Sequence, residues 1–272
     1  MAQRRTRIVL VVWTTLVVLF LWIPLVIIGV YAFNKSNIQD WPIDGFSVKW
    51  FGEAWNNSEV RDAFVLSLKA GLGATAAALV LGTALAFALH RFRFFGRDVI
   101  SFLFVLPIAL PGIVTGMSLN RFFDVAHGAT GWHGFNPSLW TIIVGHATFC
   151  MVIVFNNVVA RLRRTSPSLV EASQDLGADG WQTFRYVTWP TIATALVAGG
   201  LLAFALSFDE VVVTYFTAGS NNTLPLIIFG YIREGLRLPV VNVIVLVVIT
   251  LTIVPVAISV RLTRDTGILR RR

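Results

Sequence analysis

Long uncharged apolar runs recur along the chain, and short polar segments rich in arginine separate them. A run of about 20 such residues is long enough to cross roughly 30 Å of hydrocarbon as an α-helix. The pattern predicts an all-α polytopic membrane protein, organised as a single transmembrane domain over residues 1–272. We expect its six spans at Ile8–Phe33, Val65–Leu89, Val99–Leu119, Leu139–Ala160, Thr191–Phe216 and Val240–Val260.

Composition agrees with a membrane protein and argues against a soluble enzyme. Of the 272 residues, 56% are hydrophobic and only 13% are charged, and the mean hydropathy is +0.74. Ordinary soluble domains carry roughly 25% charged residues. A net charge of +8 would indicate nucleic acid in a soluble protein, but here the basic residues lie between apolar runs, so no nucleic-acid partner is expected. The single cysteine, Cys150, lies in an apolar run and is interpreted as a small buried residue.

Basic residues are distributed unequally between the two sides of the predicted spans. The side with more of them holds Arg4, Arg5, Arg7, Arg91, Arg93, Arg97, Arg161, Arg163, Arg164, Arg185, Arg261, Arg264, Arg270, Arg271 and Arg272. The other side holds Lys35, Lys49, Arg61, Arg121, Arg233 and Arg237. Because positive charge marks the cytoplasmic side, both termini are expected in the cytoplasm. The Arg270-Arg271-Arg272 tail belongs to this bias, and contact with anionic membrane lipid is an alternative role for it.

The longest predicted cytoplasmic loop, residues 161–190, carries the signals of a short helix. Its start is either Ser166-Pro167, with proline in the first helical position, or a capping box of Ser168 with Glu171. Its end is Gly177, because glycine best tolerates the left-handed conformation that follows many helices.

A second helix is expected directly after the first one. Asp179 with Gln182 has the spacing of a capping box, and Pro190 marks the entry to the fifth span. The first helix exposes apolar residues that call for a partner, or for packing on the chain's own membrane ends, namely Leu169, Val170, Ala172 and Leu176.

This loop resembles the EAA loop of ABC-importer permeases. That family's pattern is E-A-A, three residues, G, nine residues, then I-x-L-P, and the chain has Glu171-Ala172-Ser173, Gly177 and Val187-Thr188-Trp189-Pro190 at the same spacing. Three positions differ in identity but keep a small, a β-branched apolar and a bulky apolar character, namely Ser173, Val187 and Trp189. Within the family the chain looks most like the spermidine/putrescine-type permeases, through the segments Leu106–Gly112, Ser207–Glu210 and Thr223–Pro225.

The resemblance implies a type I ABC-importer permease fold in a bacterial inner membrane, as a transport subunit and not an enzyme. It implies two ATPase subunits, a second permease, expected to be a different but related chain, and an external substrate-binding protein. Residues implied to couple the chain to the ATPase are Leu169, Glu171, Ala172, Ser173, Leu176 and Gly177. ATP and Mg²⁺ are expected on the partner and no cofactor on this chain, since Lys35, Lys49 and Lys69 each lack the preceding glycine of a phosphate-binding loop. No catalytic or metal motif is present.

Two acids, Asp209 and Glu210, interrupt an apolar run that resumes with Val211-Val212-Val213. Acids inside a span are costly and indicate function; the alternative is that the span ends at Phe208 and the acids lie in a wet loop. Adjacent helical positions point about 100° apart, so at most one acid faces the path directly. The family resemblance favours Asp209 as the counter-charge for a cationic polyamine. Tyr215 and Phe216 are candidates for cation–π contacts, with interfacial aromatics as the alternative.

Other polar and helix-breaking residues predict local features of the spans. Pro107, Pro111, Gly112 and Gly116 are expected to kink or loosen the third span. His146 and Asn156-Asn157 are interpreted as interhelical hydrogen-bond partners and not as ligands.

The sequence therefore predicts the permease subunit of an ATP-driven importer, for a small cation such as spermidine or putrescine. Within the same class, the alternative substrate is another small solute, such as an amino-acid derivative. The alternative from another class is a subunit of an ion-gradient-driven secondary transporter, which would need more ionisable groups inside the membrane.

Overall fold

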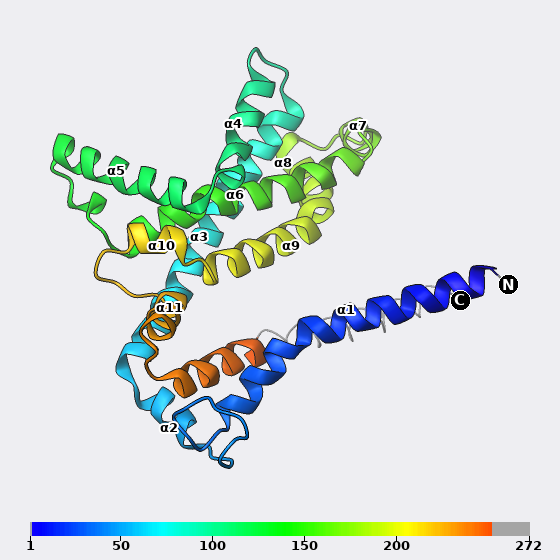
Figure 1. Ribbon diagram of the computed structural model, residues 1–272. Coiled ribbons are helices and arrows are strands. Elements are labelled where there is room, and N and C mark those ends of the chain that lie inside the picture. The colour runs from blue at the N-terminus through cyan, green and yellow to red at the C-terminus, as the bar shows by residue number, and fades with distance from the viewer. Residues whose placement is uncertain (1, 252–272) are drawn as a thin grey trace. The chain divides into compact units, whose positions relative to one another are not determined.

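A computed structural model describes residues 2–251 of the chain (Figure 1). Within these residues every regular element is helical, and the only β-type pairing is an isolated antiparallel bridge between Asn34 and Phe46. The predicted all-α class is therefore confirmed for this part of the chain. Its residues form two compact units, one from the residues up to Arg61 together with those from Ile228 onward, and the other from Asp62–Ile227. The single-domain organisation stays a prediction.

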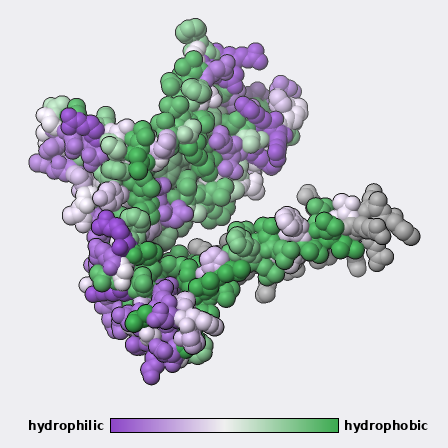
Figure 2. Space-filling model, viewed as in Figure 1, coloured by the Kyte–Doolittle hydropathy of each residue, from purple (hydrophilic) through white to green (hydrophobic). Residues whose placement is uncertain are grey.

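The first unit contains α1 (Ala2–Ala32), whose apolar side chains are exposed from Ile8 to Trp22, while Ala32 at its end is buried. Figure 2 shows it covered almost continuously by hydrophobic residues. A helix that is apolar on all sides suits a hydrocarbon environment. In α2 (Lys49–Asn56) the indole N–H of Trp50 donates to the backbone oxygen of Asn34 at 2.7 Å. The unit also holds the beginning of α3 (Ser58–Arg91), most of α11 (Leu224–Glu234) and the apolar helix Leu238–Leu251.

The second unit is built around α6 (Leu139–Arg164), which packs lengthwise against α9 (Trp189–Phe208) (Figure 1). Its apolar core joins these two helices to α3 through Ala78, Ala86, Phe149, Val154, Phe155, Val158, Ile192 and Ala203. Close approach of α3 to α6 depends on Gly82, because a Cβ there would lie 2.6 Å from the backbone oxygen of Met151.

The remaining elements of the second unit surround this core. They are α4 (Arg97–Ala109), α5 (Gly112–Thr130), a 3₁₀ turn at His133–Phe135, α7 (Ser168–Asp175), α8 (Gly180–Thr183), a π-helical turn at Phe184–Thr188 and α10 (Val212–Thr217). α10 packs against both α5 and α6, and α4 packs against α6.

Four helices in the described part of the chain are long and apolar enough to cross a membrane: Thr6–Ala32, Ser58–Arg91, Leu139–Arg164 and Gly180–Phe208. α4 and α5 together supply a fifth if the bent pair counts as one span. The predicted first, second and fourth spans fall on the first three of these helices. Only the beginning of the sixth predicted span, Val240–Val260, lies within the described residues, where it forms part of Leu238–Leu251.

The third predicted span, Val99–Leu119, is divided between α4 and α5, in line with the kink that its proline and glycine residues predicted. The helix axis bends by 107° between α4 and α5, with Leu110 in an extended conformation (φ −81°, ψ 144°). The cause is Pro111, which disfavours helical geometry in the residue before it and lacks an N–H of its own. The predicted kink is thus located at Leu110–Pro111, whereas Pro107 lies inside α4.

The fifth predicted span, Thr191–Phe216, has the wrong boundaries, and the alternative that the span ends at Phe208 is the one observed. Its helix runs continuously from Gly180, through the π-helical turn, to Phe208. The chain then leaves the helix at Asp209 and re-enters one as α10. Hydropathy does not detect this break, because Val211-Val212-Val213 is as apolar as the helix before it.

Candidate functional site

Two regions of the second unit carry the predicted site residues. The first is the helix pair, formed by α7 and α8 with the turn between them. The second, which we name the corner, comprises residues 209–217, where α9 ends and α10 follows.

The turn of the helix pair has the predicted geometry. Gly177 adopts the left-handed conformation with φ +86°, and nothing lies within 4 Å of where its Cβ would be. Glycine is therefore favoured here by backbone conformation and not by lack of space. The capping box at α8 is confirmed. The backbone N–H of Gln182 donates to Asp179 Oδ1 at 2.8 Å, and the backbone N–H of Asp179 donates to Gln182 Oε1 at 2.9 Å. Neither predicted side-chain cap forms at α7, which starts after Pro167.

Of the four apolar residues predicted to be exposed on α7 and its end, all are exposed except Val170, which is partly buried. Leu176 is 89% exposed and Leu169 is 50% exposed, while Glu171 and Ala172 are also exposed. Ser173 lies differently, because its Oγ is 3.0 Å from Thr183 Oγ1 in α8. That hydrogen bond fastens α7 to α8, so Ser173 contributes to the internal structure of the pair.

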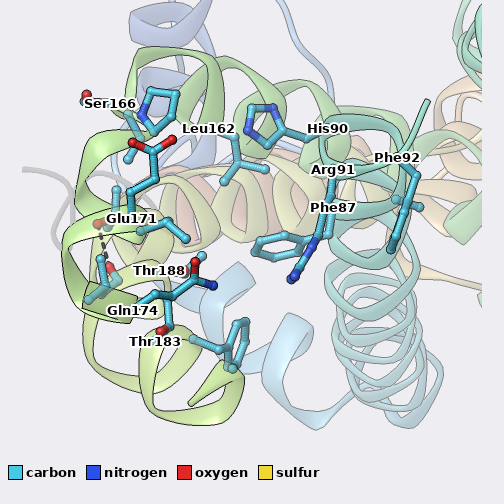
Figure 3. Close-up of a pocket in the computed structure, with 18 of the residues that line it drawn as sticks. Phe87, His90, Arg91, Phe92, Leu162, Ser166, Glu171, Gln174, Thr183 and Thr188 are labelled. Atoms are coloured by element: carbon cyan, nitrogen blue, oxygen red, sulfur yellow. Dashed lines mark hydrogen bonds between the residues drawn. The ribbon is translucent and has the colours of Figure 1, made fainter. Parts of the chain in front are cut away.

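Glu171 also lines a cavity of about 710 Å³ between the helix pair and the ends of α3 and α6. Figure 3 shows Glu171 and Ser166 on one side of this cavity, with His90, Arg91 and Phe92 of the α3 end on the other. An acid on α7 thus faces a basic helix end across an open space, a pairing that the linear sequence did not reveal.

At the corner the two acids have different surroundings. Asp209 is the C-cap of α9 (φ −95°, ψ 1°) and is exposed. Glu210 is partly buried, and its Oε1 accepts a hydrogen bond from the backbone N–H of Val213 at 2.9 Å. Glu210 therefore satisfies an N–H at the start of α10, as a capping side chain does. Of the two carboxylates, that of Asp209 is the more open.

The two aromatic candidates also differ. Tyr215 is 59% exposed, whereas Phe216 is partly buried. Phe216 packs onto Gly116 of α5 so closely that a Cβ at Gly116 would lie 2.6 Å from the Phe216 ring. Asp209 and Tyr215 are thus open to contact, while Phe216 is used in packing α10 against α5.

Three polar side chains outside the predicted site hold α10 in place. The Thr141 hydroxyl is 2.8 Å from the backbone oxygen of Thr217, and the Asn120 amide donates to that of Phe216 at 2.7 Å. His146 contacts Thr214, which confirms its interpretation as an interhelical partner. Asn157 instead donates within its own helix, to the oxygen of Ile153. Polar residues in apolar runs signal such contacts, but sequence spacing does not identify the partners.

Metal binding finds no support in the described residues. Across 2–251, no group of three His, Cys, Asp or Glu side chains is arranged to hold a metal ion. The exposed groups at the corner include the carboxylate of Asp209 and the phenol of Tyr215.

Comparison with known proteins gives consistent matches. Residues 78–267 match the family described as binding-protein-dependent transport system inner membrane component. PotI, the putrescine transport system permease protein of Escherichia coli K12, is 36% identical over 226 residues, covering 82% of this chain and 79% of PotI. PotC, the spermidine/putrescine transport system permease protein of the same strain, is 32% identical over 253 residues, covering 92% of each chain.

A solved structure shares the fold. It is a chain of a bacterial ABC transporter involved in the import of the acidic polysaccharide alginate, with a TM-score of 0.68, 18% sequence identity and 97% of both chains covered. The likeness extends over nearly the whole length, so the fold is that of an ABC-importer membrane chain.

Proposed function

This chain belongs to the family of inner membrane components of binding-protein-dependent transport systems, and we propose that it is the permease subunit of a polyamine ABC importer. Members of this family are multi-pass membrane components of transporters and not enzymes. The observation that carries the polyamine assignment is the alignment of most of the chain with permease proteins of putrescine and spermidine/putrescine systems.

The proposed topology has six spans and both termini in the cytoplasm. Four long apolar helices and the bent α4–α5 pair supply five of the spans, and Leu238–Leu251 begins the sixth. The excess of arginine at the ends and loops on one side supports the orientation. In this orientation the helix pair lies in the cytoplasm.

The proposed partners are two ATPase subunits, a second permease chain and an external substrate-binding protein. The helix pair offers the ATPase an exposed apolar face through Leu169, Ala172 and Leu176. α8 continues through the π-helical turn into α9, so a displacement of the pair is passed directly to a spanning helix. ATP and Mg²⁺ bind to the ATPase subunits.

Asp209 is the proposed contact for the cationic substrate. Its carboxylate is exposed at the end of a spanning helix, and Tyr215 is exposed within the short helix α10 that follows. A carboxylate forms charge-assisted hydrogen bonds with an ammonium group, and an aromatic face attracts the same cation. Glu210 is a weaker candidate, because its carboxylate already accepts from Val213.

Uptake in cells tests the function. Cells that lack their own polyamine uptake receive the complete transporter with or without this chain, and labelled putrescine and spermidine are followed separately. Uptake that depends on this chain and is blocked by unlabelled polyamine supports the proposal. Competition by amino-acid derivatives but not by polyamines would support the alternative substrate class. Uptake that persists without ATP but collapses with the ion gradient would indicate a secondary transporter.

A further inference from the structure

One buried histidine connects both sides of the corner. His146 lies within α6 and is 1% exposed. Its Nδ1 is 2.7 Å from Ser207 Oγ near the end of α9, and its Nε2 is 2.8 Å from Thr214 Oγ1 in α10. Asp209 lies between these two tethered positions in the chain.

The hydrogen bonds around His146 have a single consistent direction. The hydroxyl of Thr214 donates to the backbone oxygen of Glu210 at 2.8 Å, which uses its only proton. Thr214 Oγ1 therefore accepts from His146 Nε2–H. A neutral imidazole with its proton on Nε2 accepts at Nδ1, so the Ser207 hydroxyl is the donor there. The chain of bonds runs from Ser207 through His146 and Thr214 to Glu210.

We propose that His146 is a positioning residue, which fixes the angle between α9 and α10 and thereby the direction in which Asp209 faces the transport path. This inference rests on the proposed role of Asp209. The end of α9 alone holds Asp209 weakly, since its amide donates to the oxygen of Ala205 at 3.3 Å. The bonds from His146 hold the residues before and after it.

Filling space does not require a histidine at this place. An apolar side chain of similar volume would pack among the helices without needing hydrogen-bond partners, whereas a buried polar group is costly unless its bonds are made. The His146 ring instead forms hydrogen bonds to α9 and to α10, on the two sides of the helix break, and so favours one angle between these helices. Without the two hydrogen bonds of His146, we expect the angle between α9 and α10 to vary while the protein stays folded.

Two variants separate packing from hydrogen bonding. His146→Leu removes both bonds, while His146→Gln keeps one N–H donor and one acceptor. In the assembled transporter we expect His146→Leu to lower polyamine uptake about tenfold, as for the loss of two ordinary hydrogen bonds, and His146→Gln to recover most of it. In an Asp209→Asn background, His146→Leu should lower uptake by less than about twofold more, because coupled residues are not additive. Equal losses in both backgrounds would contradict the inference.

A distance measurement tests the same inference without any substrate. Spin labels replace the exposed residues Leu201 of α9 and Tyr215 of α10 in a Cys150→Ala background, and their separation is measured in the full transporter. We expect a narrow distribution of label-to-label distances in the protein with His146 and in His146→Gln, and a broad distribution in His146→Leu. An unchanged narrow distribution in His146→Leu would overturn the positioning role. If the wild-type complex carried no polyamine, the proposed function would fail, while the distances would still decide the role of His146.

Discussion

In the helix pair and in the corner alike, one helix ends and another begins within a few residues. The hydrogen bonds that stabilise the two regions differ in the sequence separation of the residues they join. In the helix pair, the Ser173–Thr183 hydrogen bond joins residues ten positions apart, and the caps are closer still. At the corner, the side chains of Asn120, Thr141 and His146 bond to residues 61 to 96 positions away. The helix pair is therefore shaped by neighbouring residues, and the corner by the assembled helices around it.

This difference matches the two proposed tasks. An element that holds its own shape can move as one body when the ATPase pulls on it. A corner held by three surrounding side chains changes when the helices carrying them shift. In the proposed importer, the ATPase thus binds an element that short-range contacts stabilise. The geometry of the substrate contact depends instead on how the surrounding helices pack.

Removal of the charge at Asp209 is expected to have the largest effect. Asp209→Asn keeps the shape of the side chain but loses a charge-assisted bond worth about 1.5–3 kcal/mol, so uptake should fall about ten- to a hundredfold. Uptake of labelled polyamine, normalised to assembled complex, measures this. The matched control is Glu210→Gln, which keeps an oxygen for Val213 and should lose less. A larger loss in the control would assign the contact to Glu210.

Polar substitution of the exposed leucines should weaken the ATPase interface next. Leu169→Asp with Leu176→Asp places two charges in a face expected to be buried by the partner. Unpaired buried polar groups cost about 1–3 kcal/mol in proteins, so captured ATPase should fall tenfold or more. Co-purification from solubilised membranes measures the ratio of subunits. Gln174→Asp on the same helix is the control, since Gln174 lines the cavity instead; equal loss in the control would argue against a specific apolar interface.

A β-branched residue at Gly177 should have a smaller effect confined to the turn. Gly177→Val places a side chain at φ +86°, where the left-handed conformation costs about 1–2 kcal/mol. Transport per ATP hydrolysed should fall while membrane insertion persists. Gly177→Asn is the control, because asparagine tolerates this conformation better. If both variants transport normally, the turn has no coupling role.

The smallest effect is expected from Ser173→Ala. It removes the bond that fastens α7 to α8, worth about 0.5–1.5 kcal/mol. Local protection of the α7 amides from hydrogen exchange should fall, with little change in the α6 core. Uptake should drop by less than in Gly177→Val. Unchanged exchange in α7 would mean that the contact contributes nothing to the pair.

The range of the contacts also explains what the sequence could predict. The left-handed Gly177 and the Asp179–Gln182 box follow from spacing of a few residues, and both are observed. Pro111 predicted a break, but not that the chain would bend by 107° there. The end of α9 at Phe208 was one of two alternatives that the sequence left open, because apolar residues follow the two acids. The Glu171 cavity was missed, because its far side comes from α3, distant in the sequence.

The most direct test of the account is ATP-driven uptake by the purified transporter in sealed proteoliposomes. The complex contains this chain, its second permease and the ATPase subunits, with the binding protein and labelled spermidine or putrescine on the opposite side from ATP. The account predicts accumulation of the polyamine that requires ATP and the binding protein. Hydrolysis of ATP with no movement of polyamine, or polyamine uptake driven by an ion gradient in the absence of ATP, would contradict it.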